Sequence, residues 1–211
     1  MFLPPLYVIL DTQFFQSPLD PFLGTLSKAG GGWVQLRDKT ASSKDFFELA
    51  REFVSLCHQF SLVAIINDRV DIAMLTDADG VHLGQDDLPV EEARKLLGAG
   101  KIIGYSTHNL TQALEAQGSS ADYVAIGPVF PTVSKQNPDP IVSQEDLKVV
   151  RREVTKPLVA IGGITVDNAG PLFDIGIDSV AVIRDLLLAD DLAGRVRQYL
   201  SIAERRSRNA V

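Results

Sequence analysis

Three side chains that can bind an anion alternate along the segment QLRDK at positions 35–39. The segment ends a run of apolar residues that begins at position 32, so we interpret it as the end of a β-strand. Successive side chains of a strand point to opposite faces, which places Gln35, Arg37 and Lys39 on one face. One amide and two cations on one face suit a phosphate. The alternative is an exposed strand edge whose charges are solvated.

Carboxylates follow the next two apolar runs. Asp68 follows LVAIIN (62–67), and the adjacent Asp86 and Asp87 follow GVHL (80–83) and a short turn. In a chain with formal net charge −7 such carboxylates repel one another, and one would tend to stay protonated unless a cation is present. Mg²⁺ prefers carboxylate oxygens and keeps positions for water and substrate phosphate. We therefore predict Mg²⁺ between Asp68 and one of the pair, although Asp68 could instead cap the following helix.

Residues that can bind further anions follow the later apolar runs. They are GYSTH (104–108), GPVFPTVSK (127–135), Gly162-Gly163 and Ile183-Arg184. Glycine turns and helix N-termini after the seventh and eighth strands are the usual phosphate site of a parallel barrel. The sequence therefore predicts two anion sites. One is metal-assisted on strands two to four, and the other uses backbone amides on strands seven and eight.

Eight short apolar runs must position these residues. They are 6–10, 32–38, 62–67, 80–83, 101–106, 122–127, 157–162 and 179–183. Most are continuous, which is typical of parallel strands buried on both faces. Amphipathic segments such as 42–60 separate them. A repeat of roughly 25 residues predicts one (β/α)₈ TIM barrel of eight parallel strands, a single domain over residues 1–211. The alternative, an open doubly wound sheet, needs a glycine-rich turn after the first strand, and YVILDTQFF (7–15) stands there instead.

The composition excludes several classes of protein. Hydrophobic residues make up 45% and charged residues 22%, which is a globular profile. A pI near 4.9 without a basic stripe excludes a general nucleic-acid or anionic-membrane binder. Cys57 is the only cysteine, so no internal disulfide is expected. We see no signal peptide and no apolar run near the ~20 residues of a membrane helix, so we expect a cytoplasmic protein.

Seven motifs, in order, resemble the thiamine-phosphate synthase (thiamine-phosphate pyrophosphorylase) family, which is related to thiazole tautomerase. They are QLRDK, INDRVDIA, DGVHLGQDDLP, GYSTH, YVAIGPVFPTVSK, AIGGI and DSVAVI. Each is weak alone, but their order is specific, and the resemblance covers residues 6–200. It implies a transferase of thiamine biosynthesis that uses Mg²⁺. Its partners would be two small molecules, hydroxymethylpyrimidine diphosphate and a thiazole phosphate, which it would join with release of pyrophosphate.

The resemblance also implies roles for individual residues. The pyrimidine diphosphate would be held by Gln35, Arg37, Lys39, Asn67 and Ser106. Mg²⁺ would be bound by Asp68 and Asp87, with Asp86 flanking. The thiazole phosphate would be held by Thr132, Val133, Ser134, Gly163, Ile183 and Arg184. The leaving pyrophosphate would be stabilised by Arg37, Lys39, Ser106 and Lys135, while the electron-rich aminopyrimidine stabilises the cation that remains.

Other interpretations stay open. A thiazole tautomerase on the same fold would use His108 as acid and base without a metal, and a non-catalytic barrel would only bind a phosphate ligand. Asp68 and Asp87 favour the synthase. Arg184 replaces the serine that is common in the family. Its guanidinium could bind the thiazole phosphate, or it could point to solvent while backbone amides hold the phosphate. We expect the second, since Asp185, Asp190 and Asp191 offer it other partners. His82, inside an apolar run, is interpreted as a hydrogen-bonded structural residue. The oligomeric state, including a homo-oligomer, stays open.

Overall fold

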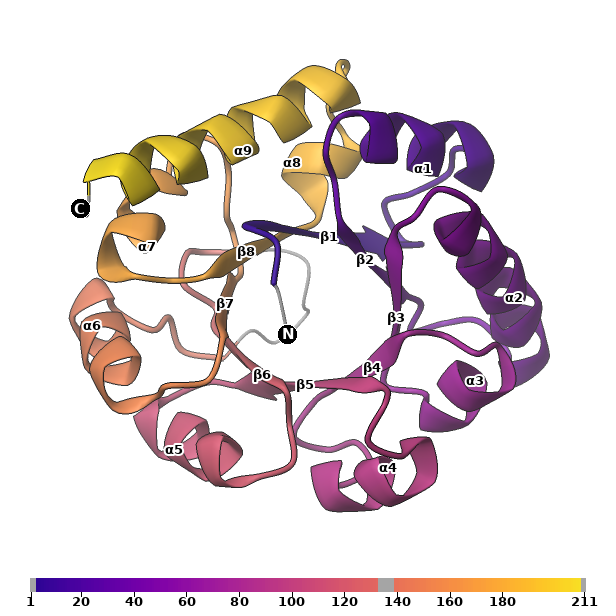
Figure 1. Ribbon diagram of the computed structural model, residues 1–211, viewed down its shortest axis with the longest axis horizontal. Coiled ribbons are helices and arrows are strands. Elements are labelled where there is room, and N and C mark those ends of the chain that lie inside the picture. The colour runs from indigo at the N-terminus through magenta and orange to yellow at the C-terminus, as the bar shows by residue number, and fades with distance from the viewer. Residues whose placement is uncertain (1–2, 133–138, 210–211) are drawn as a thin grey trace.

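A closed barrel of eight parallel strands forms the centre of the computed structural model, which describes residues 3–132 and 139–209 (Figure 1). The strands are β1 (Leu6–Asp11), β2 (Trp33–Arg37), β3 (Val63–Asn67), β4 (Gly80–Leu83), β5 (Ile102–Thr107), β6 (Tyr123–Ile126), β7 (Leu158–Ile161) and β8 (Ser179–Val182). Each strand pairs with the next in the chain, and β8 pairs with β1 to close the ring. The predicted (β/α)₈ fold and its strand order are confirmed.

Helices surround the barrel on the outside (Figure 1). They are α1 (Leu19–Lys28), α2 (Ser43–Gln59), α3 (Val70–Leu75), α4 (Val90–Leu97), α5 (Leu110–Gly118), α6 (Gln144–Glu153), α7 (Gly170–Ile175), α8 (Arg184–Leu187) and α9 (Leu192–Asn209). Ser42, Asn109 and Ser143 cap three of them by accepting from an amide in the first turn. Within the described part of the chain, no helix is long and apolar enough to cross a membrane.

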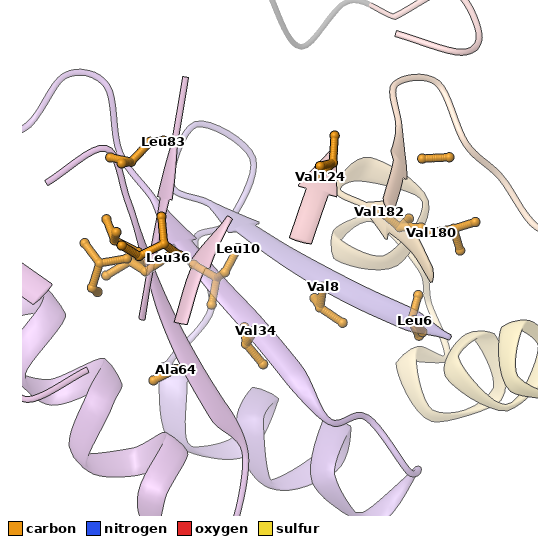
Figure 2. Packing of buried hydrophobic residues seen from close by; sticks show 14 of the residues in the cluster. Leu6, Val8, Leu10, Val34, Leu36, Ala64, Leu83, Val124, Val180 and Val182 are labelled. Atoms are coloured by element: carbon orange, nitrogen blue, oxygen red, sulfur yellow. The ribbon is translucent and has the colours of Figure 1, made fainter. Parts of the chain in front are cut away.

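The two faces of each strand bury different sets of side chains. One face packs against the helices, as Figure 2 shows for Leu6, Val8, Leu10 and their neighbours. The other face fills the inside of the barrel with Tyr7, Ile9, Trp33, Ile65, Tyr123, Ala125, Val159 and Ala181, and Leu3, which precedes β1, packs with them. This double burial is the reason that the strands read as continuous apolar runs. Each large side chain removed from water contributes about 1.5–3 kcal/mol.

Aromatic rings fill the middle of the barrel. Tyr7, Trp33 and Tyr123 meet edge to face, with ring centroids 5.8–5.9 Å apart. Tyr123 also stacks on His82, with centroids 5.6 Å apart. Gly104 leaves the space that the Tyr123 ring occupies, because a Cβ at position 104 would lie 2.0 Å from Tyr123 Cζ. The inside of the barrel is therefore filled by packed side chains.

This packing predicts a large difference between two glycine substitutions. Gly104→Ala should destabilise the protein by about 2 kcal/mol or more, because the tyrosine ring has no free space to move into. Gly100→Ala is the matched control, since nothing lies within 4 Å of its added Cβ, and its effect should stay within about 0.5 kcal/mol. Urea unfolding of both variants measures the difference. Equal effects would mean that the interior at Gly104 is not tightly filled.

Candidate active site

Several of the predicted site residues that the structure describes lie where the strands end. Strand register pairs Asp11 with Arg37 between β1 and β2, and Asn67 with His82 between β3 and β4. Ser106 lies beside Ala125 near the ends of β5 and β6. All of these positions are at the carboxyl ends of parallel strands, which form one end of the barrel. This end is called the mouth below.

Arg37 is held in the mouth by Asp11, a residue that the sequence analysis missed. The guanidinium Nη1 donates to Asp11 Oδ2, and the backbone N–H of Gln13 donates to Asp11 Oδ1 at 3.0 Å. Asp11 is 1% exposed, so its carboxylate needs these donors. A signal was present in the sequence, because an aspartate ends the otherwise apolar run LYVILD.

Lys39 and Asp68 form a second ion pair at the mouth. Lys39 Nζ donates to Asp68 Oδ2 at 2.5 Å. The backbone of Asp68 is left-handed, with φ 62°, a conformation that costs a non-glycine residue of order 1 kcal/mol or more. Helix α3 begins at Val70, and its N-cap is Arg69 without a side-chain cap, so Asp68 does not cap that helix. The alternative role considered for Asp68 is therefore excluded.

The structure separates the two adjacent aspartates. Asp86 is exposed, whereas Asp87 is partly buried and its Oδ2 accepts from the N–H of Gly84 at 2.7 Å. Burial, followed by the neighbouring carboxylate of Asp68, raises the pKa of Asp87. The two carboxylates that affect each other are thus those of Asp68 and Asp87, in the loops that follow β3 and β4. Among the described residues, no group of three or more histidine, cysteine, aspartate or glutamate side chains is placed to hold a metal.

Three further predicted site residues lie on β2, β3 and β5. Asn67 is 7% exposed, and its Nδ2 has no hydrogen-bond partner in the described part of the chain. Ser106 Oγ is 2.8 Å from His82 Nε2. Gln35 is 2% exposed and donates from Nε2 to Tyr7 Oη at 2.8 Å, so its amide nitrogen is engaged inside the barrel. Burial lowers the pKa of His82 to about 4, which keeps the ring neutral.

The second predicted anion site lies at the ends of β7 and β8. Gly162 and Gly163 have φ values of 102° and 64°, and a Cβ on Gly163 would lie 2.3 Å from the carbonyl oxygen of Pro131. Glycine is therefore required where the loop after β6 crosses the end of β7. Ile183 precedes α8, and its carbonyl oxygen accepts from the N–H groups of Leu186 and Leu187 at 3.2 and 3.0 Å. The amides at the start of this short helix, those of Arg184 and Asp185, come before the first helical hydrogen bond. Thr132 is in the described part of this loop, but Val133, Ser134 and Lys135 lie outside the described residues.

Arg184 and His108 occupy the rim of the mouth. The Arg184 guanidinium lies over the Phe14 ring, with Cζ 5.5 Å from the centroid. Arg184 is exposed, as expected. Asp185, one of the partners considered for it, is instead bound by Arg195 at 2.5 Å and by Tyr199 at 2.8 Å. His108 Nδ1 is 2.6 Å from the carbonyl oxygen of Gly127, which fixes the orientation of its ring.

Comparison with known proteins gives one consistent result. A family model described as Thiamine monophosphate synthase matches residues 6–186. A Thiamine-phosphate synthase of Chlorobium luteolum is 45% identical over 199 residues, which cover 94% of this chain and 92% of that protein. The Thiamine-phosphate synthase of Clostridium novyi is 40% identical over 198 residues, with 93% and 97% covered. A solved thiamine phosphate pyrophosphorylase from Pyrococcus furiosus has a TM-score of 0.84 at 33% identity and covers 95% of this chain and 96% of its own.

The raised pKa of Asp87 predicts that its charge destabilises the free protein. A carboxyl whose pKa is higher in the folded state loses its stabilising contribution as the pH rises through that pKa. Asp87→Asn keeps an acceptor for Gly84 but removes the charge, so at pH 7 in a chelator it should raise Tm by about 1–3 °C.

The gain from Asp87→Asn should shrink as the pH falls through the raised pKa, because the wild-type carboxyl then becomes neutral too. Asp86→Asn is the control, and its Tm should change by less than about 1 °C, since Asp86 is exposed. A lower Tm for Asp87→Asn than for Asp86→Asn at pH 7 would show that the charge of Asp87 does not destabilise the free protein.

Proposed function

The chain belongs to the thiamine-phosphate synthase family of transferases, and from that premise we propose how its mouth performs the reaction. Hydroxymethylpyrimidine diphosphate binds over β2 to β5, and a thiazole phosphate binds over β6 to β8. Joining them releases pyrophosphate and gives thiamine phosphate. The observation that carries this proposal is the repelling pair Asp68 and Asp87 beside Lys39, since carboxylates and cations together suit a metal-bound diphosphate.

The two carboxylates fit Mg²⁺. This ion takes oxygen ligands, and it is usually bound by one or two carboxylates that substrate phosphates and waters supplement. Asp68 and Asp87 would hold it, and a divalent cation would offset the burial and the neighbouring Asp68 carboxylate that together raise the pKa of Asp87. When bound, Mg²⁺ supplies positive charge for the leaving pyrophosphate. Asp86 is exposed and would not take part.

Positive side chains of the mouth would bind the diphosphate. Arg37 is oriented by Asp11, and Lys39 by Asp68, so neither has to be ordered entirely by the substrate. Both would face oxygens whose negative charge grows as pyrophosphate departs. Lys135 would do the same, a role that stays a prediction from family resemblance.

The neutral donors of the mouth would orient the pyrimidine diphosphate. Asn67 Nδ2 is a buried donor without a described partner, and such a group costs free energy until it finds an acceptor. A substrate acceptor atom would satisfy it. Ser106 would donate to the diphosphate, and Gln35 would contribute from beneath. The aminopyrimidine stabilises the cation left on its CH₂ group, so the protein has no proton to remove from carbon.

The thiazole phosphate would be held largely by backbone N–H groups. Gly163 leaves room for close approach, and the amides of Ile183 and Arg184 precede or begin α8, with Thr132 on the facing loop. Val133 and Ser134 are assigned to the same site by resemblance. This arrangement would bring the thiazole nitrogen to the pyrimidine CH₂ group. The cytoplasmic location stays a prediction, and the oligomeric state stays open.

Activity of the aspartate variants tests the proposal. Wild-type protein with both substrates and Mg²⁺ should release thiamine phosphate and pyrophosphate in equal amounts. Asp87→Asn should lower turnover by about 100-fold, on the order of 3 kcal/mol, because removal of a group that stabilises transition-state charge costs that much. Asp86→Asn should lower it less than about threefold.

Three results would count against the proposal in different ways. Equal losses in the two aspartate variants, or full activity in a strong chelator, would remove the metal assignment. Conversion of a thiazole alone would indicate a tautomerase. Tight ligand binding without turnover would indicate a binding protein.

Replacement of Arg184 tests the thiazole phosphate site. The guanidinium already packs on Phe14, and backbone amides can satisfy a phosphate without it. Arg184→Ser should therefore change KM for the thiazole phosphate by less than about tenfold, which is under ~1.4 kcal/mol. Steady-state kinetics with each substrate varied in turn measures this. A loss near 100-fold that is confined to the thiazole substrate would show that the side chain itself holds the phosphate.

A further inference from the structure

We propose that His82 is a positioning residue that fixes the hydroxyl of Ser106 as a hydrogen-bond donor toward the mouth. The inference rests on the proposed function, in which Ser106 contacts the diphosphate. His82 itself touches no substrate in this account. It acts through the direction of a hydrogen-bond chain that crosses the barrel.

The chain runs through side chains of five strands. Gln35 Nε2 on β2 donates to Tyr7 Oη on β1 at 2.8 Å, and Tyr7 Oη is 3.0 Å from Tyr123 Oη on β6. Tyr123 Oη is 2.9 Å from His82 Nδ1 on β4, and His82 Nε2 is 2.8 Å from Ser106 Oγ on β5. Each of four of these residues is at most 6% exposed: Gln35, Tyr7, Tyr123 and His82. Bulk water therefore cannot accept hydrogen bonds from them, and their donors need acceptors inside the protein.

The amide of Gln35 sets the direction of this chain. Its Nε2 can only donate, so Tyr7 accepts from it, and the proton of Tyr7 needs another acceptor. Tyr123 Oη is the acceptor that the described contacts provide. Tyr123 must then donate its own proton to His82 Nδ1. Nδ1 therefore carries no hydrogen, and the neutral ring carries its hydrogen on Nε2.

The opposite direction fails at Tyr7. If His82 Nδ1 donated to Tyr123, Tyr123 would have to donate to Tyr7, which already accepts from Gln35. The proton of Tyr7 would then be buried without an acceptor among the described residues, a loss that buried hydroxyl groups avoid. One direction thus satisfies every member of the chain, and the other does not.

The direction of the hydrogen-bond chain determines the role of the Ser106 hydroxyl, at its end. Ser106 Oγ accepts from His82 Nε2–H, so its own O–H points elsewhere. A serine hydroxyl otherwise rotates freely between donor and acceptor roles. Ser106 is partly exposed at the end of β5, where the free direction for its proton is the mouth. A donor fixed before the substrate binds needs no reorientation when charge develops on the pyrophosphate.

The hydrogen position on His82 gives a test that is independent of activity. Nuclear magnetic resonance of the intact protein with ¹⁵N-labelled histidine distinguishes the two tautomers from the nitrogen shifts and the ring couplings. The protein has three histidines. The signals that are lost in the spectrum of His82→Gln are those of His82. We expect hydrogen on Nε2 at neutral pH. Hydrogen on Nδ1 would overturn the inference and leave the proposed function untouched.

Kinetics with both substrates test whether His82 acts through Ser106. His82→Phe removes the donor and should lower kcat by about tenfold or more, with KM changed less than about threefold. In a Ser106→Ala background the same change should cost less than about threefold, because its target is gone. His82→Gln should restore most of the activity, since its amide can donate to Ser106. An equal loss from His82→Phe in both backgrounds would show a merely structural role and overturn the inference.

Two further outcomes bear on the role of His82 and on the proposed function. If His82→Phe does not fold, His82→Gln and the tautomer of the unmodified protein still decide the question. If the wild-type protein does not join the two substrates, the proposed function fails, while an Nδ1–H tautomer would separately disprove the direction of the chain.

Discussion

Repulsion between Asp68 and Asp87 is the interaction on which the mouth depends. The chain has formal net charge −7, and its family acts on phosphates. A protein with a negative overall charge needs positive groups near a bound phosphate. Lys39 compensates Asp68 in the free protein, but burial and Asp68 still raise the pKa of Asp87. A left-handed backbone at Asp68 adds strain at the same point. Both costs are understandable if a cation is the missing partner of the two carboxylates.

The barrel interior makes this arrangement possible. Edge-to-face contacts among Tyr7, Trp33 and Tyr123 fill the space beneath the mouth, and Gly104 is small so that Tyr123 fits. Polar atoms on the same rings form the hydrogen-bond chain that ends at Ser106. The interior thus serves packing and orientation together, because each strand turns alternate side chains inward.

The sequence predicted local features well and distant partners poorly. Continuous apolar runs gave the strands, and Asp68 and Asp87 could be placed because they follow neighbouring runs. The pairing of Asp11 with Arg37 requires knowing that β1 and β2 end in register. The hydrogen bonds expected for the buried His82 are present, but its partners Tyr123 and Ser106 lie 41 and 24 positions away. Which of Asp86 and Asp87 turns inward depends on the local turn at Gly84, which periodicity does not specify.

Calorimetric titration of pyrophosphate, with and without Mg²⁺, tests the central claim most directly, because it measures metal-assisted anion binding apart from chemistry. The account predicts one site per chain, with affinity at least about tenfold higher in Mg²⁺ than in a chelator, about 1.4 kcal/mol or more. Asp87→Asn should abolish that increment, and Asp86→Asn should keep it. Equal affinity with and without Mg²⁺ in the wild-type protein would contradict the account.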